Sequence, residues 1–255
     1  MLGNTGVIIQ VRTGSTRLTG KMILPFYEGQ SMIELIIDRF VSEISNNIPL
    51  IIATTDNPLD DAIENIARHK KVNLYRGSEN DVLLRFIRAS EKFKLENVIR
   101  VCADNPLFDL KGTLALKSYL ETNEWDYVGY KIMGDRPTIL THSGFWGEVV
   151  TLPALKKAHE ETSESVYREH VTNYIHQHPG KFRVKLVDAP DCLFYRDDIR
   201  LTVDTTEDFE MMQELYSRLI EENIRPEPVN IISYIDDHPE YLTRMNRQIE
   251  LNRKV

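Results

Sequence analysis

Hydrophobic residues along this chain fall into short, nearly continuous runs that are separated by longer amphipathic stretches. Runs of four to eight residues, rich in Val and Ile, occupy positions 6–11, 49–54, 72–75 and 97–103. Unbroken runs of this length are typical of strands that are buried on both faces of a parallel sheet. The N-terminal part of the chain therefore predicts neighbouring strands of one buried sheet.

Between these runs the pattern changes to that of amphipathic helices. The letters SMIE at 31–34 form a capping-box pattern and predict a helix to about Ser45. SEND at 78–81 predicts another helix to Phe93, and a helix at 59–69 is expected between them. Strands and helices thus alternate through three strand-helix-strand crossovers, which predicts an α/β fold with a mostly parallel sheet flanked by helices.

The regular alternation ends near residue 124. Beyond it the pattern predicts two strands and two helices in irregular order, at 125–130, 152–161, 166–178 and 182–187. We interpret 124–200 as an insertion, or arm, within one domain that spans 1–255, because a chain of this length can bury one large core. The last expected elements are a strand at 200–204, a helix at 206–222 and two short amphipathic helices from Asn230 onward.

Composition narrows the classes of function. The net charge of −8 argues against general nucleic-acid binding, which depends on clustered Lys and Arg. No stretch approaches eighteen apolar residues and no signal peptide is recognisable, so we expect a cytoplasmic protein that does not cross a membrane. Cys102 and Cys192 lack the spacing of a disulfide framework or a metal site and are expected to be reduced thiols.

The strongest chemical signal follows the first predicted strand, where residues 10–21 read QVRTGSTRLTGK. Three cations, Arg12, Arg17 and Lys21, stand among hydroxyl groups and glycines at the mouth of a sheet. Cations and backbone N–H groups in such a loop can neutralise a polyphosphate. The segment fits neither the P-loop pattern nor G-x-G-x-x-G, which argues against a P-loop NTPase and an ordinary dinucleotide enzyme. We predict a nucleoside triphosphate loop, with a solvated basic surface loop as the alternative.

Two predicted strands end on an aspartate: Asp104 in RVCADNPLFD at 100–109, and Asp204 in LTVDTTED at 201–208. Ligands of open α/β sheets bind beyond the carboxyl ends of the strands, so both carboxylates could converge on one Mg²⁺ ion and substrate phosphates. Local roles are the alternatives. Asp104 could form an Asx turn, and Asp204 or Thr206 could cap the next helix, with Thr206 the expected cap.

These segments resemble motifs of the sugar cytidylyltransferases, specifically the spore-coat polysaccharide type, which are related to the CMP-KDO and CMP-sialate synthetases. The loop is similar to their Q-x-R-x-G-S-T-R-L-P-G-K signature, with Thr19 at the usual proline. The aspartate segments are similar to R-x-x-x-D-C-P-L-x-D and L-T-V-D-T-P-E-D, with Asn105 and Thr206 at the cysteine and proline positions. The resemblance implies a Rossmann-like fold of the nucleotide-diphospho-sugar transferase type, and Mg²⁺ bound by Asp104 and Asp204.

The resemblance also implies which residues bind CTP. Within the loop these are Gln10, Arg12, Gly14, Ser15 and Lys21, and the cations Arg12, Arg17 and Lys21 are expected to be catalytic. Residues 75–86, YRGSENDVLLRF, resemble the family segment F-R-G-S-x-x-D-V-L-x-R-[YF] and add Arg76 and Ser78 to the nucleotide site. A helix cap followed by an exposed arginine is the alternative for this segment, and the choice of CTP over UTP stays open.

Two further segments resemble family elements in the insertion. GFWGEVV at 144–150 and YREHVT at 167–172 are similar to G-x-x-x-E-V and R-E-H-V-T, which makes Glu148, Arg168 and His170 candidates to bind the acceptor sugar. Neighbouring residues on a helix point about 100° apart, so this run cannot present one catalytic face, and a surface or subunit-interface role is the alternative. In related synthetases this region pairs two subunits, which implies a homodimer.

The sequence therefore predicts a Mg²⁺-dependent cytidylyltransferase. It would join CMP from CTP to an acidic sugar of the 2-keto-3-deoxy type, release pyrophosphate and serve surface polysaccharide biosynthesis. Two other classes stay open: a nucleotide-sugar-dependent glycosyltransferase, and a catalytically inactive nucleotide-binding subunit. The sequence identifies neither the acceptor sugar nor a general base.

Overall fold

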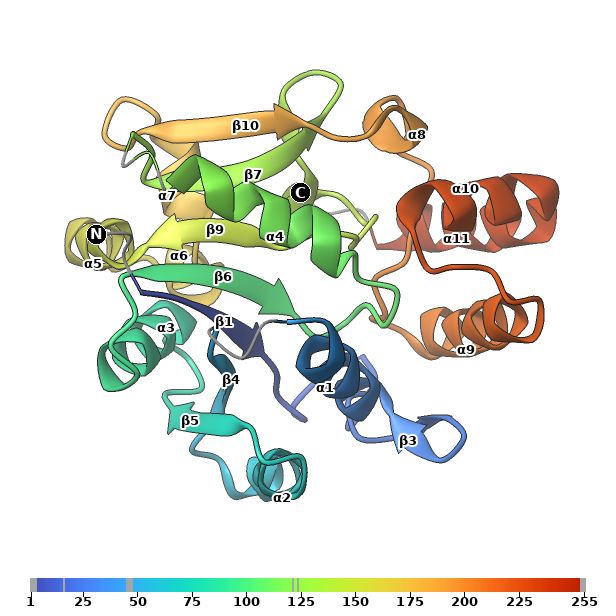
Figure 1. Ribbon diagram of the computed structural model, residues 1–255, viewed down its shortest axis with the longest axis horizontal. Helices are drawn as coiled ribbons and strands as arrows, with labels where there is room; N and C mark the ends of the chain where they lie inside the picture. The colour runs from blue at the N-terminus through green and yellow to red at the C-terminus, as the bar shows by residue number, and fades with distance from the viewer. Residues whose placement is uncertain (1–3, 16, 45–47, 121, 123, 253–255) are drawn as a thin grey trace.

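A twisted central sheet with helices on both faces organises the molecule (Figure 1). The computed structural model describes the chain except residues 1–3, 16, 45–47, 121, 123 and 253–255. Thr16 of the loop, and Ser45 at the predicted end of the first helix, thus lie outside the described residues. The elements of the first half are β1 (Thr5–Gln10), β2 (Pro25–Tyr27), β3 (Gln30–Ser31), α1 (Met32–Glu43), β4 (Leu50–Thr55), η1 (Pro58–Asp60), α2 (Asp61–His69), β5 (Asn73–Gly77), α3 (Val82–Lys92) and β6 (Asn97–Cys102).

The second half is richer in short elements. These are α4 (Leu110–Leu120), β7 (Tyr127–Ile132), β8 (Arg136–Pro137), η2 (Thr138–Leu140), β9 (Glu148–Thr151), α5 (Leu152–Glu161), α6 (Ser165–Glu169), α7 (Asn173–Gln177), β10 (Val184–Asp188), α8 (Asp191–Phe194), α9 (Thr206–Glu221), α10 (Pro228–Asp237) and α11 (Pro239–Leu251). Within the described residues, the main sheet has the order β10-β7-β9-β6-β1-β4-β5, with β8 paired to β7.

The predicted parallel half of the sheet is confirmed. β1 lies between β4 and β6 and runs parallel to both, and β5 extends the sheet beyond β4. At the carboxyl end of β1, Gln10 is level with Ala53 on one side and Cys102 on the other. The continuous apolar runs fold this way because both faces are covered: Val7, Ile8 and Ile9 are fully buried. This register fixes which side chains meet at the edge of the sheet where the site forms.

Helix α1 starts as its capping pattern predicts, whereas the start of α3 is shifted. The Ser31 backbone N–H donates to Glu34 Oε2 at 2.9 Å, as the predicted capping box requires, and α1 begins there. The N-cap of α3 is Asp81, whose Oδ1 accepts from the Leu84 N–H at 2.7 Å. Ser78 instead accepts from the Asp81 N–H at 3.0 Å. The cap of α3 thus lies three residues later than the pattern at 78–81 predicts.

The segment 124–200 supplies strands to the same sheet. β9 pairs antiparallel with both β6 and β7, and β10 runs parallel to β7 at the outer edge. The expected single helix at 166–178 is wrong, because α6 and α7 are separated by residues 170–172. His170 leaves the helical region there with φ −100° and ψ 76°, and Thr172 turns its fully buried side chain to Glu148.

The expected strand at 200–204 is also wrong. The segment is extended and buried, but its hydrogen-bond partners come from two loops and not from one adjacent strand. The N–H groups of Leu201 and Thr202 donate to the His142 carbonyl at 3.0 and 3.3 Å, and the Val203 N–H donates to the Asp104 carbonyl at 2.8 Å. Such mixed pairing satisfies the buried backbone without a ladder.

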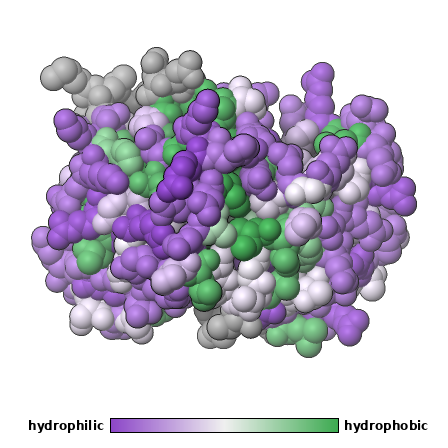
Figure 2. Space-filling model, turned by 90° about the horizontal axis from the view of Figure 1, so that it is seen from below, coloured by the Kyte–Doolittle hydropathy of each residue, from purple (hydrophilic) through white to green (hydrophobic). Residues whose placement is uncertain are grey.

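Each face of the sheet has its own hydrophobic core. One cluster joins the sheet to α1, α2 and α4 and to α9, α10 and α11, and the other joins it to α3, α5 and α7. On the face drawn in Figure 2, hydrophilic side chains predominate and hydrophobic ones gather in a central band. Among the described residues, no helix is both long enough and apolar enough to span a bilayer.

Candidate active site

The basic loop after β1 is tethered to the sheet by a buried carboxylate. Asp60 Oδ1 accepts from the backbone N–H and the hydroxyl of Thr13 at 2.8 and 2.6 Å, and Oδ2 accepts from the Thr54 hydroxyl at 2.9 Å. Burial by itself would raise the pKa of Asp60, but the bonds from Thr13, Thr55 and Thr54 outweigh it, so the pKa is lowered. The ionised Asp60 thus holds the start of the loop.

The far end of the loop folds back onto its start. The Gly20 N–H donates to the Thr13 carbonyl at 3.0 Å, and Gly20 has φ +71°, a value that glycine adopts without strain. This turn closes a compact cradle and directs Lys21 toward the segment after residue 200.

Asp104 and Asp204 come together as the sequence predicts. The backbone bond between Val203 and Asp104 joins their segments, and both aspartates line a pocket with a volume of about 830 Å³. Gln10, Arg17 and His170 line the same pocket. The walls come from the carboxyl ends of β1 and β6 on one side, and from η2, α6 and α7 of the segment 124–200 on the other.

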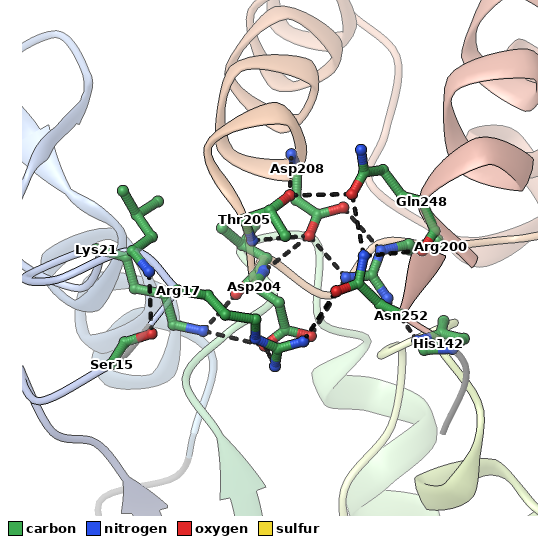
Figure 3. A network of polar contacts seen from close by, with 12 residues as sticks. Ser15, Arg17, Lys21, His142, Arg200, Asp204, Thr205, Asp208, Gln248 and Asn252 are labelled. Atoms are coloured by element: carbon green, nitrogen blue, oxygen red, sulfur yellow. Dashed lines mark hydrogen bonds and ion pairs between the residues drawn. The ribbon is translucent and has the colours of Figure 1, made fainter. Parts of the chain in front are cut away.

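Cations surround Asp204 on several sides (Figure 3). Arg17 Nη2 lies 3.0 Å and Lys21 Nζ 3.3 Å from its Oδ1, and Arg200 Nη2 lies 3.3 Å from its Oδ2. The Lys21 ammonium also donates to the Val203 carbonyl. Because the Lys21 and Asp204 side chains are only 11% and 14% exposed, solvent screens this group weakly. Three positively charged side chains are therefore clustered at the edge of the pocket that holds the two carboxylates.

Arg12 lies apart from this group. Its Nη2 is 3.5 Å from Glu169 Oε1 on α6, and both side chains are well exposed at 40% and 55%. An exposed pair of this length contributes little to stability, so Arg12 can exchange Glu169 for a phosphate at small cost. Gly14 and Ser15 lie in the loop between Arg12 and Lys21, with the Gly14 Cα beside Glu79 and the Ser15 hydroxyl accepting from the Leu18 N–H at 3.4 Å.

A buried ion pair supports Asp204 from below. Asp208 accepts two bonds of 2.7 Å from Arg200, and its Oδ2 also accepts from the N–H groups of Asp204 and Thr205 at 3.0 and 2.9 Å. Thr205, not Thr206, is the N-cap of α9, since its hydroxyl accepts from the Asp208 N–H at 3.1 Å. Asp204 is therefore not the cap, and its carboxylate is directed at the cations of the loop.

The C-terminal helix also reaches this site, which sequence reasoning missed. Asn252 Oδ1, just beyond α11, accepts from Arg17 Nη1 at 3.2 Å. Gln248 Oε1 accepts from the Thr205 hydroxyl and from Asn252 Nδ2, both at 3.2 Å (Figure 3). The last turn of α11 thus connects the loop to the cap of α9. No motif marks these residues, because their partners lie up to 235 positions away.

We expect N252A to weaken CTP binding by about two- to fivefold, the value of a hydrogen bond to an exposed charged group. Arg17 is 51% exposed, and without its amide partner it would sample more orientations. Titration of CTP monitored by calorimetry measures the change. N246A is the matched control, because Asn246 is exposed on the same helix and shows no hydrogen bond to the described residues of the loop. Equal affinity in wild type and N252A would contradict a contribution from α11.

Eight predicted site residues are not among the described residues that line the pocket. Four of them, Arg12, Gly14, Ser15 and Lys21, belong to the loop, where Arg12 and Lys21 pair with the pocket residues Glu169 and Asp204. The other four lie elsewhere. Glu148 is 2% exposed and is bonded to Arg100, Tyr127 and Thr172 beneath the pocket. The remaining three, Arg76, Ser78 and Arg168, are outside the set of described residues that line the pocket. The structure therefore does not bring these four to a ligand in this pocket.

Local contacts explain those positions. Arg76 bonds the Thr55 carbonyl at 2.9 Å and carboxylates of α2 at 2.6 and 2.7 Å, which raise its pKa. Arg168 donates to the His159 carbonyl at 2.8 Å and lies 3.4 Å from Asp81, so it faces α3 and α5. His170 faces the pocket instead. The predicted divergence of Arg168 and His170 is thus observed.

The donor set fits a magnesium ion that is completed by a ligand. Among the described residues, no group of three or more His, Cys, Asp and Glu side chains is arranged to hold a metal alone. Mg²⁺ is usually bound by one or two carboxylates, waters and substrate phosphate oxygens, and Asp104 and Asp204 offer this number of carboxylates in one pocket.

Comparison with known proteins decides the family. The family model described as Cytidylyltransferase matches residues 6–244. The chain belongs to the cytidylyltransferase family. As a member of it, the protein is a CTP-using nucleotidyltransferase, which confirms the class of enzyme predicted from the loop and the aspartate segments.

Two relatives of this cytidylyltransferase match nearly end to end. It is 37% identical over 235 residues to an uncharacterized protein of Methanocaldococcus jannaschii, covering 91% of this chain and 90% of the relative. It is 33% identical over 219 residues to the spore coat polysaccharide biosynthesis protein SpsF of Bacillus subtilis, covering 83% and 85%. The match therefore includes the segment 124–200 as well as the parallel half of the sheet.

Solved structures of the cytidylyltransferase type share the fold. A cytidylyltransferase from Leptospira borgpetersenii superposes with a TM-score of 0.77 at 27% identity, covering 94% of this chain and 97% of that one. A CMP:2-keto-3-deoxy-manno-octonic acid synthetase complexed with CTP gives 0.62 at 14% identity, covering 84% and 98%. At that identity the second likeness shows the fold alone, and it agrees with the predicted nucleotide-diphospho-sugar transferase type.

Proposed function

We propose that this enzyme transfers CMP from CTP to a hydroxyl group of an acidic sugar, with Mg²⁺ as cofactor, and releases pyrophosphate. The observation that carries the proposal is the shared pocket in which Asp104 and Asp204 meet the cations of the loop. Surface polysaccharide synthesis is the proposed role, by analogy with the name of the Bacillus relative. A cytoplasmic location and a homodimer belong to the same proposal.

The chain's own cations would carry most of the catalysis. Phosphoryl-type transfer depends on positioning and on stabilisation of developing negative charge, with little covalent chemistry for the protein. Lys21 is held by the Val203 carbonyl, so its ammonium is already oriented when CTP arrives. Arg17 and Arg12 are more exposed and would close over the phosphates, Arg17 from Asp204 and Arg12 from Glu169.

Asp104 and Asp204 would hold the magnesium ion. When bound, Mg²⁺ would neutralise phosphate charge and lower the pKa of a coordinated hydroxyl group. Asp204 is prepared for this role by its surroundings, since Asp208 holds its backbone N–H, Arg200 contacts its Oδ2, and the residue lines the pocket. When Arg17 turns to a phosphate, Asp204 would lose one of its cation partners and its Oδ1 would be more available to hold the ion.

The acceptor would lie against the segment 124–200. That wall of the pocket carries Arg136 and His170, with the amide side chain of Asn173. Arginine binds carboxylates well, which supports an acidic acceptor. The pocket has room for a nucleotide and a sugar together, since ligand sites commonly measure about 300–1,000 Å³.

Pyrophosphate release tests the proposal. We expect release with CTP, Mg²⁺ and one member of a panel of 2-keto-3-deoxy sugar acids, and a baseline rate with the other three nucleoside triphosphates or with EDTA. D104A should lower the rate at least about 10²-fold, as loss of a metal ligand would. CTP binding without release from any acid would contradict the proposed function and favour a glycosyltransferase or an inactive nucleotide-binding subunit.

A further inference from the structure

A buried polar network lies beneath the pocket and connects three neighbouring strands. Arg100 of β6 is level with Glu148 of β9, and its Nη1 donates to Glu148 Oε2 at 2.6 Å. The other donors to Glu148 are the hydroxyl groups of Tyr127 and Thr172, with Thr172 at 3.0 and 2.9 Å from the two oxygens. Both carboxylate oxygens of Glu148 are therefore used within the protein.

Arg100 links this network to the pocket. Its side chain is 6% exposed and lines the pocket floor, and its Nη2 donates to Gln10 Oε1 at 3.3 Å. Gln10 ends β1 and lies partly buried at the same floor. The contacts thus connect the buried Glu148, through Arg100, to the side-chain amide of Gln10, which lines the pocket.

The network fixes which end of the Gln10 amide faces the ligand. An amide can be turned by 180° with little change of shape, so its orientation follows from its partners. A guanidinium group has only donors, and it therefore requires the oxygen of Gln10. The Nε2 group, with its two N–H donors, is then the polar group that Gln10 offers to the pocket.

The position of Gln10 matches one part of the proposed acceptor. Gln10 is two residues before Arg12, and Cys102, its partner in register, is two residues before Asp104. It therefore lies between the start of the loop and the proposed metal carboxylate, where the proposed function places the reacting groups. In a 2-keto-3-deoxy sugar acid the carboxylate is on the same carbon as the anomeric hydroxyl group, so both must lie there together.

Resting on the proposed function, we infer that Gln10 is a specificity-determining residue, whose Nε2 group donates to the carboxylate of the acceptor and not, as the sequence resemblance implies, to CTP. Arg100 and Glu148 are positioning residues for it. Glu148 thus acts through Arg100 and not by contact with the sugar. The element G-x-x-x-E-V would therefore contribute to acceptor recognition indirectly, because its glutamate positions Arg100.

Q10E is the direct test, because it keeps the shape and replaces the N–H donors by a second oxygen and a negative charge. We expect the KM for the acid sugar to rise at least about 30-fold, in keeping with loss of hydrogen bonds to a charged group, while the KM for CTP stays within about threefold. The primary amide of the same sugar acid provides a second measurement. Wild type should favour the acid over the amide, and Q10E should reduce or reverse that preference.

Q177E is the matched control. Gln177 lines the same pocket from α7 but has Tyr167 as its partner, so Q177E measures the cost of a negative charge there without a change at the floor. Equal losses in Q10E and Q177E, or an unchanged ratio of acid to amide in Q10E, would overturn the assignment of Gln10. A wild-type enzyme that transfers CMP to no acid sugar would instead overturn the proposed function, so the two failures are distinguishable.

Discussion

Replacement of Lys21 by methionine is expected to lower kcat/KM for CTP by about 10²–10³-fold. Methionine keeps much of the chain volume but removes the ammonium that lies 3.3 Å from Asp204 and is 11% exposed. Loss of one preorganised donor to a developing negative charge costs about 2.7–4 kcal/mol in comparable sites. Steady-state measurement of pyrophosphate release gives the change directly.

A loss of activity in K21M must be distinguished from a loss of stability, because Lys21 also bonds the Val203 carbonyl. K111M is the matched control, since the Lys111 side chain is 87% exposed and forms only a long pair of 3.8 Å with Glu227, among the described residues. Both variants should melt within a few degrees of wild type, and only K21M should lose activity. A K21M enzyme that keeps activity within about threefold would exclude Lys21 from transition-state stabilisation.

The second large effect is on stability. D208N is expected to lower the free energy of unfolding by about 3–5 kcal/mol, because it leaves the fully buried Arg200 without its bidentate partner. The thermal midpoint should fall by roughly 6–20 °C. D198N is the control: Asp198 pairs with Arg196 through a side chain that is 32% exposed, and its loss should cost less than about 1 kcal/mol. Similar midpoints for D208N and D198N would contradict this.

The Asp208–Arg200 pair should make the free energy of unfolding depend on pH in a known direction. Burial by itself would raise the pKa of Asp208, but the bonds and the charge of Arg200 outweigh it and lower the pKa below its ordinary value of 3.8. The folded state therefore favours the ionised form, and this stabilisation is present above about pH 4 and is lost as the pH falls toward the lowered pKa. Denaturant unfolding from pH 7 to pH 3 should show the gap between wild type and D208N narrowing.

The parallel half of the fold was predictable because its signals are local. Continuous apolar strands, a capping box and alternating helices are written in consecutive residues, and each has a single physical meaning. Helix α4 was missed because Gly112 weakens its helical signal. That glycine is required by packing, since a Cβ would lie 2.3 Å from Asp109 Oδ2 and 2.5 Å from Trp146 Nε1. Such a reason exists only in three dimensions.

In the site, too, residues with local sequence signals were predictable and residues defined by long-range contacts were not. The loop and the two aspartates could be placed together, because carboxyl ends of parallel strands share one edge of a sheet. The residues that hold them could not, since Thr13 and Asp60 are 47 positions apart and Arg200 and His142 are 58 apart. Glu148 was recognised from its motif, but nothing in that motif indicates that its side chain is buried and saturated.

The place of β9 in the sheet limits how acceptor preference can be re-engineered. Grafting 124–200 from a relative is an attractive way to exchange specificity, but β9 pairs with β6 through Asn97, Val98, Ile99 and Arg100. A foreign β9 would have to reproduce that register and also supply the acid opposite Arg100. Useful crossover points for chimeras therefore lie inside the segment, around the residues of η2, α6 and α7 that face the pocket, and not at its two ends.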